Sequence, residues 1–129
     1  NTAISFGTAS VFESATSNFC RPTFDSNSNK VVIAYTDAPT TYGTAVVGTV
    51  SGTNISFGTP VVFESATSED YGITFDSYSN KVVIGYKDNG NSNYGTAIVG
   101  TVSGTGISFG TAVVFHSAGN TYEVSAHCI

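Results

Sequence analysis

Two polar loops carry the side chains best suited to bind a ligand. Each loop begins with an aspartate and ends with a tyrosine, and the second also contains asparagines. The residues are Asp37, Tyr42, Asp88, Asn91, Asn93 and Tyr94. Aromatic rings stack on the apolar faces of sugars, while carboxylates and amides bond sugar hydroxyls. The loops therefore predict one glycan site per repeat. Two observations argue against it: tryptophan is absent, and Tyr35 and Tyr86, which precede the loops, share a strand face with Ile33 and Ile84 and so indicate core residues.

The second loop also offers oxygen atoms to a cation. A calcium-binding loop of the EF-hand type needs acidic or amide side chains at its third and fifth positions. Counting from Asp88, those positions hold Gly90 and Ser92. We therefore expect no metal and no other cofactor, with calcium as the alternative.

Three further positions invite covalent chemistry. Cys20 and Cys128 are the only cysteines, and we expect them to form a disulfide within one chain or between chains, with free thiols as the alternative. Asn54 begins the Asn-Ile-Ser acceptor pattern for N-glycosylation.

No motif in the chain indicates catalysis. The sequence contains no Gly-x-Ser-x-Gly elbow, no phosphate-binding loop and no zinc motif. Asp25 and Asp76 each precede Ser and Asn residues, a pattern typical of tight turns whose backbone the aspartate bonds. We expect no catalytic residues and predict that the protein is not an enzyme.

These candidate residues belong to a repeat of about 51 residues. The phrase Ile-Ser-Phe-Gly-Thr occurs at 4–8, 55–59 and 107–111, and a Val-Phe pair follows it each time. Both loops, and both aspartate turns, occupy equivalent places in the two copies. A function that needs one unique constellation of residues is hard to place on such a chain.

Within one period, alternating apolar and polar residues predict four strands separated by Gly, Asn, Asp and Ser clusters. In the second copy these strands are 72–75, 81–86, 95–102 and 107–115. Gly110, or Pro60 in the preceding copy, is expected to mark a bulge or bend in the last strand. Leu, Met, Gln and Trp are absent, whereas β-branched and aromatic residues abound, so the composition also predicts an all-β protein.

Four antiparallel strands in about 50 residues, ending in an edge strand, are typical of a β-propeller blade. In architecture and period, rather than in signature residues, the repeats resemble the blades of kelch, sialidase-type and lectin propellers. The resemblance implies tandem four-stranded antiparallel repeats, and a β-sandwich or β-solenoid is the alternative. The single domain, 1–129, would then comprise an orphan last strand, two repeats and a divergent partial repeat, at 1–13, 18–64, 68–116 and 117–129.

The composition also limits the classes of partner that the protein is expected to bind. Charged residues make up 10% of the chain, and the net charge of −5 argues against nucleic acid as a partner. No apolar run reaches the roughly 18 residues of a membrane-spanning helix. Low charge with abundant Ser and Thr favours an extracellular, secreted protein.

Two blades cannot close a ring, because propellers need roughly four to eight. We therefore expect a non-enzymatic structural protein that assembles with itself, either into an oligomer such as a ring of several copies or into an extracellular filament. Strands without a partner at both ends favour strand donation between copies. The alternative is a multivalent lectin with one site per repeat.

Overall fold

The computed structural model describes residues 2–119, 121 and 124, and these residues form strands connected by turns, with one short 3-10 helix. The strands are β1 (Ser17–Asp25), β2 (Lys30–Asp37), β3 (Tyr42–Ser51), β4 (Asn54–Phe57), β5 (Val61–Asp76), β6 (Lys81–Asp88), β7 (Tyr94–Ser103), β8 (Gly106–Phe109) and β9 (Val113–His116). The 3-10 helix η1 (Asn89–Asn91) lies between β6 and β7. The prediction of an all-β protein is confirmed.

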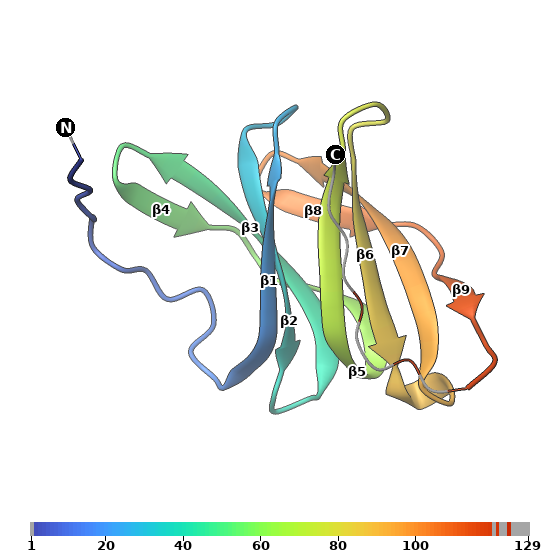
Figure 1. The fold of residues 1–129 in the computed structure, drawn as a ribbon. Coiled ribbons are helices and arrows are strands. Elements are labelled where there is room, and N and C mark those ends of the chain that lie inside the picture. Colours follow the sequence, from blue (N-terminus) through green and yellow to red (C-terminus); the bar gives the residue numbers. More distant parts are fainter. Residues whose placement is uncertain (1, 120, 122–123, 125–129) are drawn as a thin grey trace.

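All nine strands join one open sheet in which every pairing is antiparallel (Figure 1). The order along the sheet is β1-β2-β3-β5-β6-β7-β8, with β4 added to β3 and β9 added to β7. Each repeat is therefore an up-and-down meander, as the alternation of apolar residues and polar turns predicts.

The turns of the two repeats use the same residues. In the β1–β2 turn, Asp25 accepts hydrogen bonds from the backbone N–H groups of Asn27 and Ser28. In the β5–β6 turn, Asp76 accepts from the backbone N–H of Tyr78 and from the Ser79 hydroxyl. The interpretation of Asp25 and Asp76 as turn residues is confirmed.

The last strand of each repeat is split in two, and the break contains Pro60 in the first copy and Gly110 in the second, where the sequence predicts a bulge or bend. β4 pairs with the C-terminal end of β3, while residues 61–67 of β5 pair with the N-terminal end of the same strand. Residues 58–60 separate the two pieces, and Pro60 has no N–H group to donate to a ladder. The second copy repeats this arrangement with β8 and β9 on β7.

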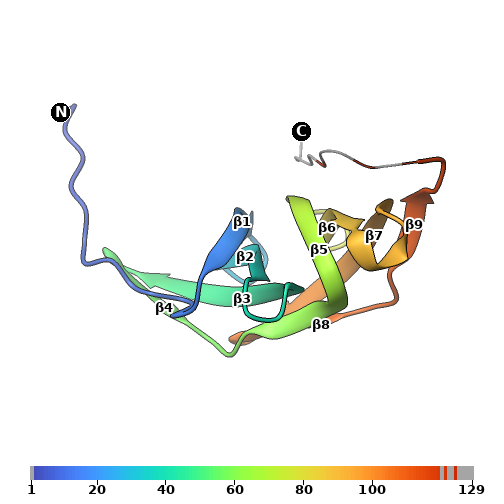
Figure 2. The ribbon, with the colours of Figure 1, turned by 90° about the horizontal axis from the view of Figure 1, so that it is seen from below.

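β5 is also longer than predicted, because it continues as one strand from the end of the first repeat into the start of the second. Residues 61–67 pair with β3, and residues 68–76 pair with β6. Near the start of the second part, between Glu69 and Gly72, the register shifts, and Asp70 has a positive φ of 56°. Figure 2 shows β5 turning from one group of strands into the other.

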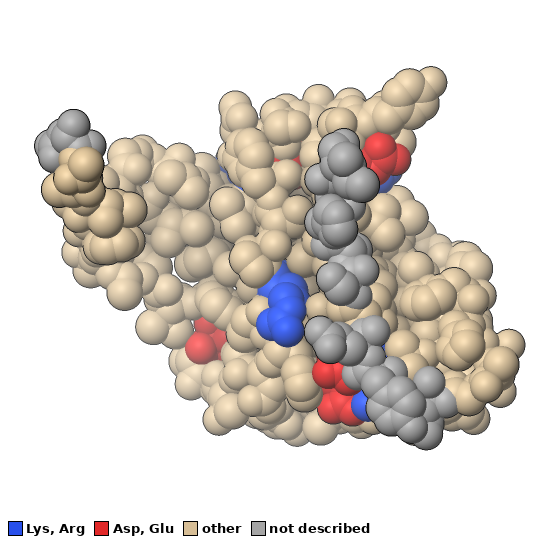
Figure 3. All heavy atoms as spheres, viewed as in Figure 1, with Lys and Arg blue, Asp and Glu red and all other residues tan. Residues whose placement is uncertain are grey.

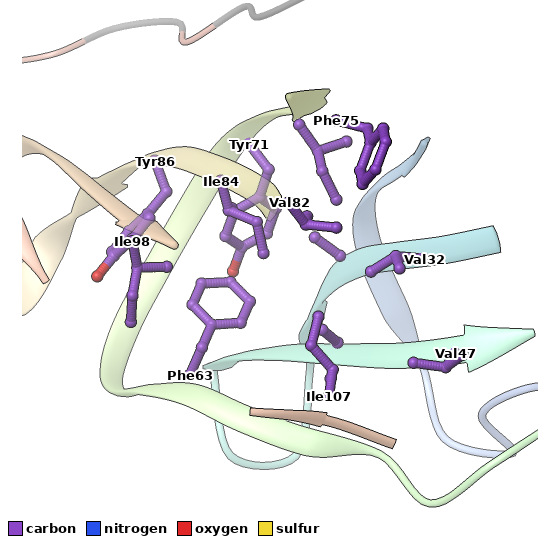
Figure 4. Packing of buried hydrophobic residues seen from close by; sticks show 13 residues of the cluster. Val32, Val47, Phe63, Tyr71, Phe75, Val82, Ile84, Tyr86, Ile98 and Ile107 are labelled. Atoms are coloured by element: carbon purple, nitrogen blue, oxygen red, sulfur yellow. The ribbon is translucent and has the colours of Figure 1, made fainter. Parts of the chain in front are cut away.

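This turn divides the sheet into two halves that pack against each other. We call β1–β4 with residues 61–67 the N-terminal half-sheet, and residues 68–76 with β6–β9 the C-terminal half-sheet. Their shared core contains the fully buried Val32 and Val47 on one side and Val82 and Ile84 on the other. Figure 4 shows these side chains in one cluster, with Phe63 of β5 among them. Each such side chain contributes about 1.5–3 kcal/mol when fully buried.

The two ends of the chain lie outside the regular repeat. Residues 2–16 contain no strand, although an orphan last strand was predicted at 1–13, and this segment extends beyond β4, far from the C-terminal half-sheet (Figures 1 and 2). Residues 117–129, the predicted partial repeat, lie largely outside the described residues. Among the described residues, no helix has the length and apolar character needed to cross a membrane.

Candidate binding and assembly surfaces

The structure brings each predicted aspartate and tyrosine of the polar loops together. Asp37 lies directly opposite Tyr42 in the ladder between β2 and β3, and Asp88 lies opposite Tyr94 between β6 and β7. These pairs form because the loops close hairpins whose strands are in register up to the last residue. The same two side chains are therefore presented at the same end of each half-sheet.

Much of the chemistry of the second loop is internal. The Asp88 carboxylate caps η1 by accepting a hydrogen bond of 3.0 Å from the Gly90 N–H. Burial raises the pKa of Asp88, and the negative charge of Glu64 raises it further. Asn91 is exposed, whereas Asn93 is half-buried with a positive φ of 60°. Of the side chains predicted to bind a ligand here, Asn91 is thus the most accessible.

The first loop contains one buried polar atom without a hydrogen-bond partner among the described residues. Asp37 Oδ2 accepts a hydrogen bond of 3.5 Å from the Thr40 hydroxyl. Its other oxygen, Oδ1, is buried and has no hydrogen-bond partner among the described residues. Nowhere in the described part of the chain do three or more His, Cys, Asp or Glu side chains come together in a group that could hold a metal ion.

The sites predicted for covalent chemistry lie at the surface where they are described. Cys20 is exposed on β1, and Cys128 lies outside the described residues, so their pairing stays a prediction. Asn54 is exposed at the first position of β4, directly after the Ser51–Asn54 turn. Its side chain is therefore accessible to the modification predicted from the sequence.

A pair of contacts that the sequence analysis missed joins the last strand of each repeat to the next half-sheet. The Tyr86 hydroxyl donates a hydrogen bond of 2.9 Å to Glu64, and the Phe63 ring lies edge-on against Tyr86 with 5.4 Å between ring centroids. Burial raises the pKa of Tyr86, and the bonded Glu64 carboxylate raises it further. The recurrence of Phe-Glu and of the tyrosine in both copies was the signal that could have revealed this contact.

The N-terminal segment makes the same contacts with the N-terminal half-sheet. The Phe12 ring lies edge-on against Tyr35 at 5.1 Å, and the Tyr35 hydroxyl donates a longer hydrogen bond of 3.4 Å to Glu13. A side chain on Gly7 would collide with the backbone of Thr53, and one on Gly58 would collide with Thr105 in the same way. Residues 7–13 therefore follow the path that residues 58–64 follow on the next half-sheet.

Beyond these contacts the N-terminal segment presents apolar side chains to solvent. Ile4, Phe6 and Val11 are all exposed, and Phe6 retains 82% of its accessible surface. Their counterparts Ile55 and Phe57 are half-buried in β4, and Ile107 is buried in β8. The segment and the β3–β4 hairpin together line a shallow, open hollow.

Charged groups are sparse on the surface. The face seen in Figure 3 carries only a few scattered acidic and basic side chains among uncharged ones. One group of charges lies on β5 and β6, where Lys87 contacts Glu69 at 2.6 Å and Asp70 at 3.4 Å.

Searches of family models, curated proteins and solved structures found no match to this chain.

Proposed function

We propose that this chain is a non-enzymatic structural repeat protein of β-propeller-like organisation that associates with itself, outside the cell, into an oligomer or filament. The open sheet with antiparallel meanders of nearly identical sequence supports this proposal. The last strand of one meander runs directly into the first strand of the next, which is also the connection between propeller blades.

The observation that carries the proposal is the exposed apolar N-terminal segment. Ile4 and Phe6 repeat positions that elsewhere in the chain lie in β4 and β8 and are wholly or partly covered by packing against β3 and β7. Apolar side chains gathered on an open surface favour association, since each gains free energy when water is excluded. A strand edge of a second copy would supply the missing neighbour.

The state of association of the purified protein tests this proposal. Light scattering on a sizing column, followed by electron microscopy of the same fractions, should show particles larger than one chain that shrink on dilution. The double variant Ile4→Asn with Phe6→Asn should form smaller particles, because both side chains are exposed and the packing of Phe12 is retained. Tyr78→Asn, at a highly exposed turn position, is the matched control. A wild-type chain that stays monomeric at every concentration would overturn the proposal.

The second candidate function is multivalent carbohydrate binding. It is favoured by the Asp37–Tyr42 and Asp88–Tyr94 pairs, which stand at the same end of both half-sheets. Two equal sites on one chain would increase affinity for multivalent glycans. Binding to a glycan array should then fall in Tyr42→Ala and Tyr94→Ala, and fall further in the double variant. An array without hits, or hits unaffected by both substitutions, would exclude this function.

A further inference from the structure

The contact between the two half-sheets joins faces that are not equivalent. The N-terminal half-sheet contributes Val32 of β2 and Val47 of β3, which lie opposite each other in their ladder. The C-terminal half-sheet contributes Val82 and Ile84 of β6. In the repeat, Val82 corresponds to Val31 and not to Val32. Because neighbouring residues of a strand point to opposite faces, the two repeats use opposite faces in this contact.

Each half-sheet consequently has a second face that copies the buried face of the other. On the N-terminal half-sheet this free face carries Phe24, Val31 and Ile33, the counterparts of Phe75, Val82 and Ile84. On the C-terminal half-sheet it carries Val83 and Val99, which lie opposite each other in the β6–β7 ladder. These two are the counterparts of Val32 and Val47.

The same residue types are buried in the internal contact and open on the free faces. Phe75 retains 6% of its accessible surface, whereas Phe24 retains 54%. Val47 retains 1%, whereas Val99 retains 45%. The free faces are therefore apolar, and the faces that correspond to them in the repeat already pack against each other inside the chain.

We infer that the free face of the N-terminal half-sheet of one copy docks on the free face of the C-terminal half-sheet of a second copy, reproducing the internal contact. This inference rests on the proposed function and identifies the partner surface. Because unlike faces meet, a docked pair still has one face of each kind available, one on each copy. Contacts of this heterologous type extend into rings or filaments rather than stopping at a dimer.

Elements of the next contact are already present on the C-terminal half-sheet. Thr121 N–H donates to the Asn93 carbonyl at 3.0 Å, as Ser68 N–H donates to the Thr41 carbonyl at 3.2 Å. Val124 lies against Gly85 on the free face of β6, and its counterpart Tyr71 reaches Thr36 on β2. These C-terminal residues thus mark where the first strand of an added half-sheet lies, and the incoming β1 takes over this position.

Two charge substitutions test the inference. Phe24→Lys blocks the free face of the N-terminal half-sheet, and Val99→Lys blocks that of the C-terminal half-sheet. Both side chains are already largely open, so neither change should unfold the chain, which circular dichroism and thermal melting would verify. Tyr78→Lys adds the same charge in the turn between β5 and β6, away from both faces, and serves as the control.

The expected result is specific to a contact between unlike faces. Each blocked variant alone should be monomeric in light scattering, because every contact needs one face of each kind. An equal mixture should form dimers and nothing larger, since one variant keeps the first face and the other keeps the second. The control should form particles of wild-type size.

Other results would overturn the inference. If either blocked variant keeps the particle size of the wild type, assembly uses another surface, and self-association itself would still stand. A mixture that stays monomeric would show that these two faces do not dock on each other. A wild-type chain that is monomeric throughout would overturn both the inference and the proposed function.

Discussion

The hydroxyl of Tyr86 donates a 2.9 Å hydrogen bond to the carboxylate of Glu64 and so ties the last strand of the first repeat to the body of the second. The tyrosine is fully buried, so its hydroxyl has no access to bulk water as an alternative partner. A buried polar group without a partner costs free energy, which makes this bond a requirement of the packing rather than an addition to it.

Glu64→Ala should therefore destabilise the fold by about 1–3 kcal/mol, because it leaves the Tyr86 hydroxyl buried without an acceptor. Glu64→Gln retains an acceptor oxygen and should cost less. Glu13→Ala is the matched control, since the equivalent bond to Tyr35 is 3.4 Å long and residues 2–16 form no strand. Urea unfolding measures all three, and equal losses for Glu13→Ala and Glu64→Ala would contradict the expected difference.

Stability should decline in alkaline solution. The folded state raises the pKa of Tyr86 above its ordinary value because burial and the Glu64 carboxylate disfavour the phenolate. This contribution to the free energy of unfolding is complete below the unfolded pKa of about 10 and is lost as pH rises through the folded pKa. Tyr71 shifts in the same direction, with burial as the main cause.

Urea midpoints measured at and above about pH 10 would show this decline, which follows from the ordinary tyrosine pKa. Tyr86→Phe should flatten the dependence on pH, whereas Tyr78→Phe, at an exposed position, should leave it unchanged. A midpoint that does not change through this range would refute the expected role of Tyr86. Lys87 must be considered as well, since its hydrogen bond to Glu69 raises its pKa and weakens over the same range.

Two equivalent isoleucines should respond differently to truncation. Ile84 is fully buried between the half-sheets, so Ile84→Ala should cost about 2–5 kcal/mol through lost burial and the cavity left behind. Ile33 holds the same repeat position but is half-buried on the free face, so Ile33→Ala should cost clearly less in the monomer. Thermal unfolding at low concentration compares the two variants. Equal losses of stability would contradict the prediction, because they would mean that Ile33 and Ile84 are buried to the same extent.

The cysteines offer a test that distinguishes pairing within a chain from pairing between chains. The native protein should carry no free thiol in a colorimetric assay under denaturing conditions. A gel without reductant should show either a shifted single-chain band or a band of doubled mass, and Cys20→Ser should remove both. Two free thiols per chain would exclude the disulfide.

If Cys20 is present as a thiol, its reaction with alkylating agents should be slow at neutral pH. Although the residue is exposed, partial desolvation of the thiol is the main cause that raises its pKa, and the thiolate is the reactive form. The alkylation rate of reduced protein, followed against pH and compared with that of free cysteine, measures this. A rate equal to that of free cysteine at neutral pH would argue against the shift.

The hairpins could be predicted from the sequence because alternating apolar residues and polar turn clusters fix them locally. The register that places Asp88 opposite Tyr94 follows from the same pattern. A bend at Pro60 or Gly110 was predicted, but a full split of the last strand was not, because it depends on where β3 stops accepting hydrogen bonds from β4 and begins accepting them from β5.

The continuity of β5 was missed for a similar reason. Residues 64–70 are mostly polar and lack the alternation that marks a half-buried strand, so pairing with β3 and β6 rather than local preference determines their conformation. The sequence also does not indicate which face of each half-sheet is buried in the contact between them. Val82 and Val83 are both apolar, and only the packing of the two half-sheets decides which of them is fully buried.

β5 also determines how a chain of this kind can change length during evolution. Because one strand closes a repeat and opens the next, duplication of about 51 residues from the middle of β5 adds a whole unit without requiring a new connecting loop. The joint between units is then always the same strand. An array built in this way can gain or lose members by recombination between near-identical segments while every remaining unit keeps its hydrogen-bonding partners.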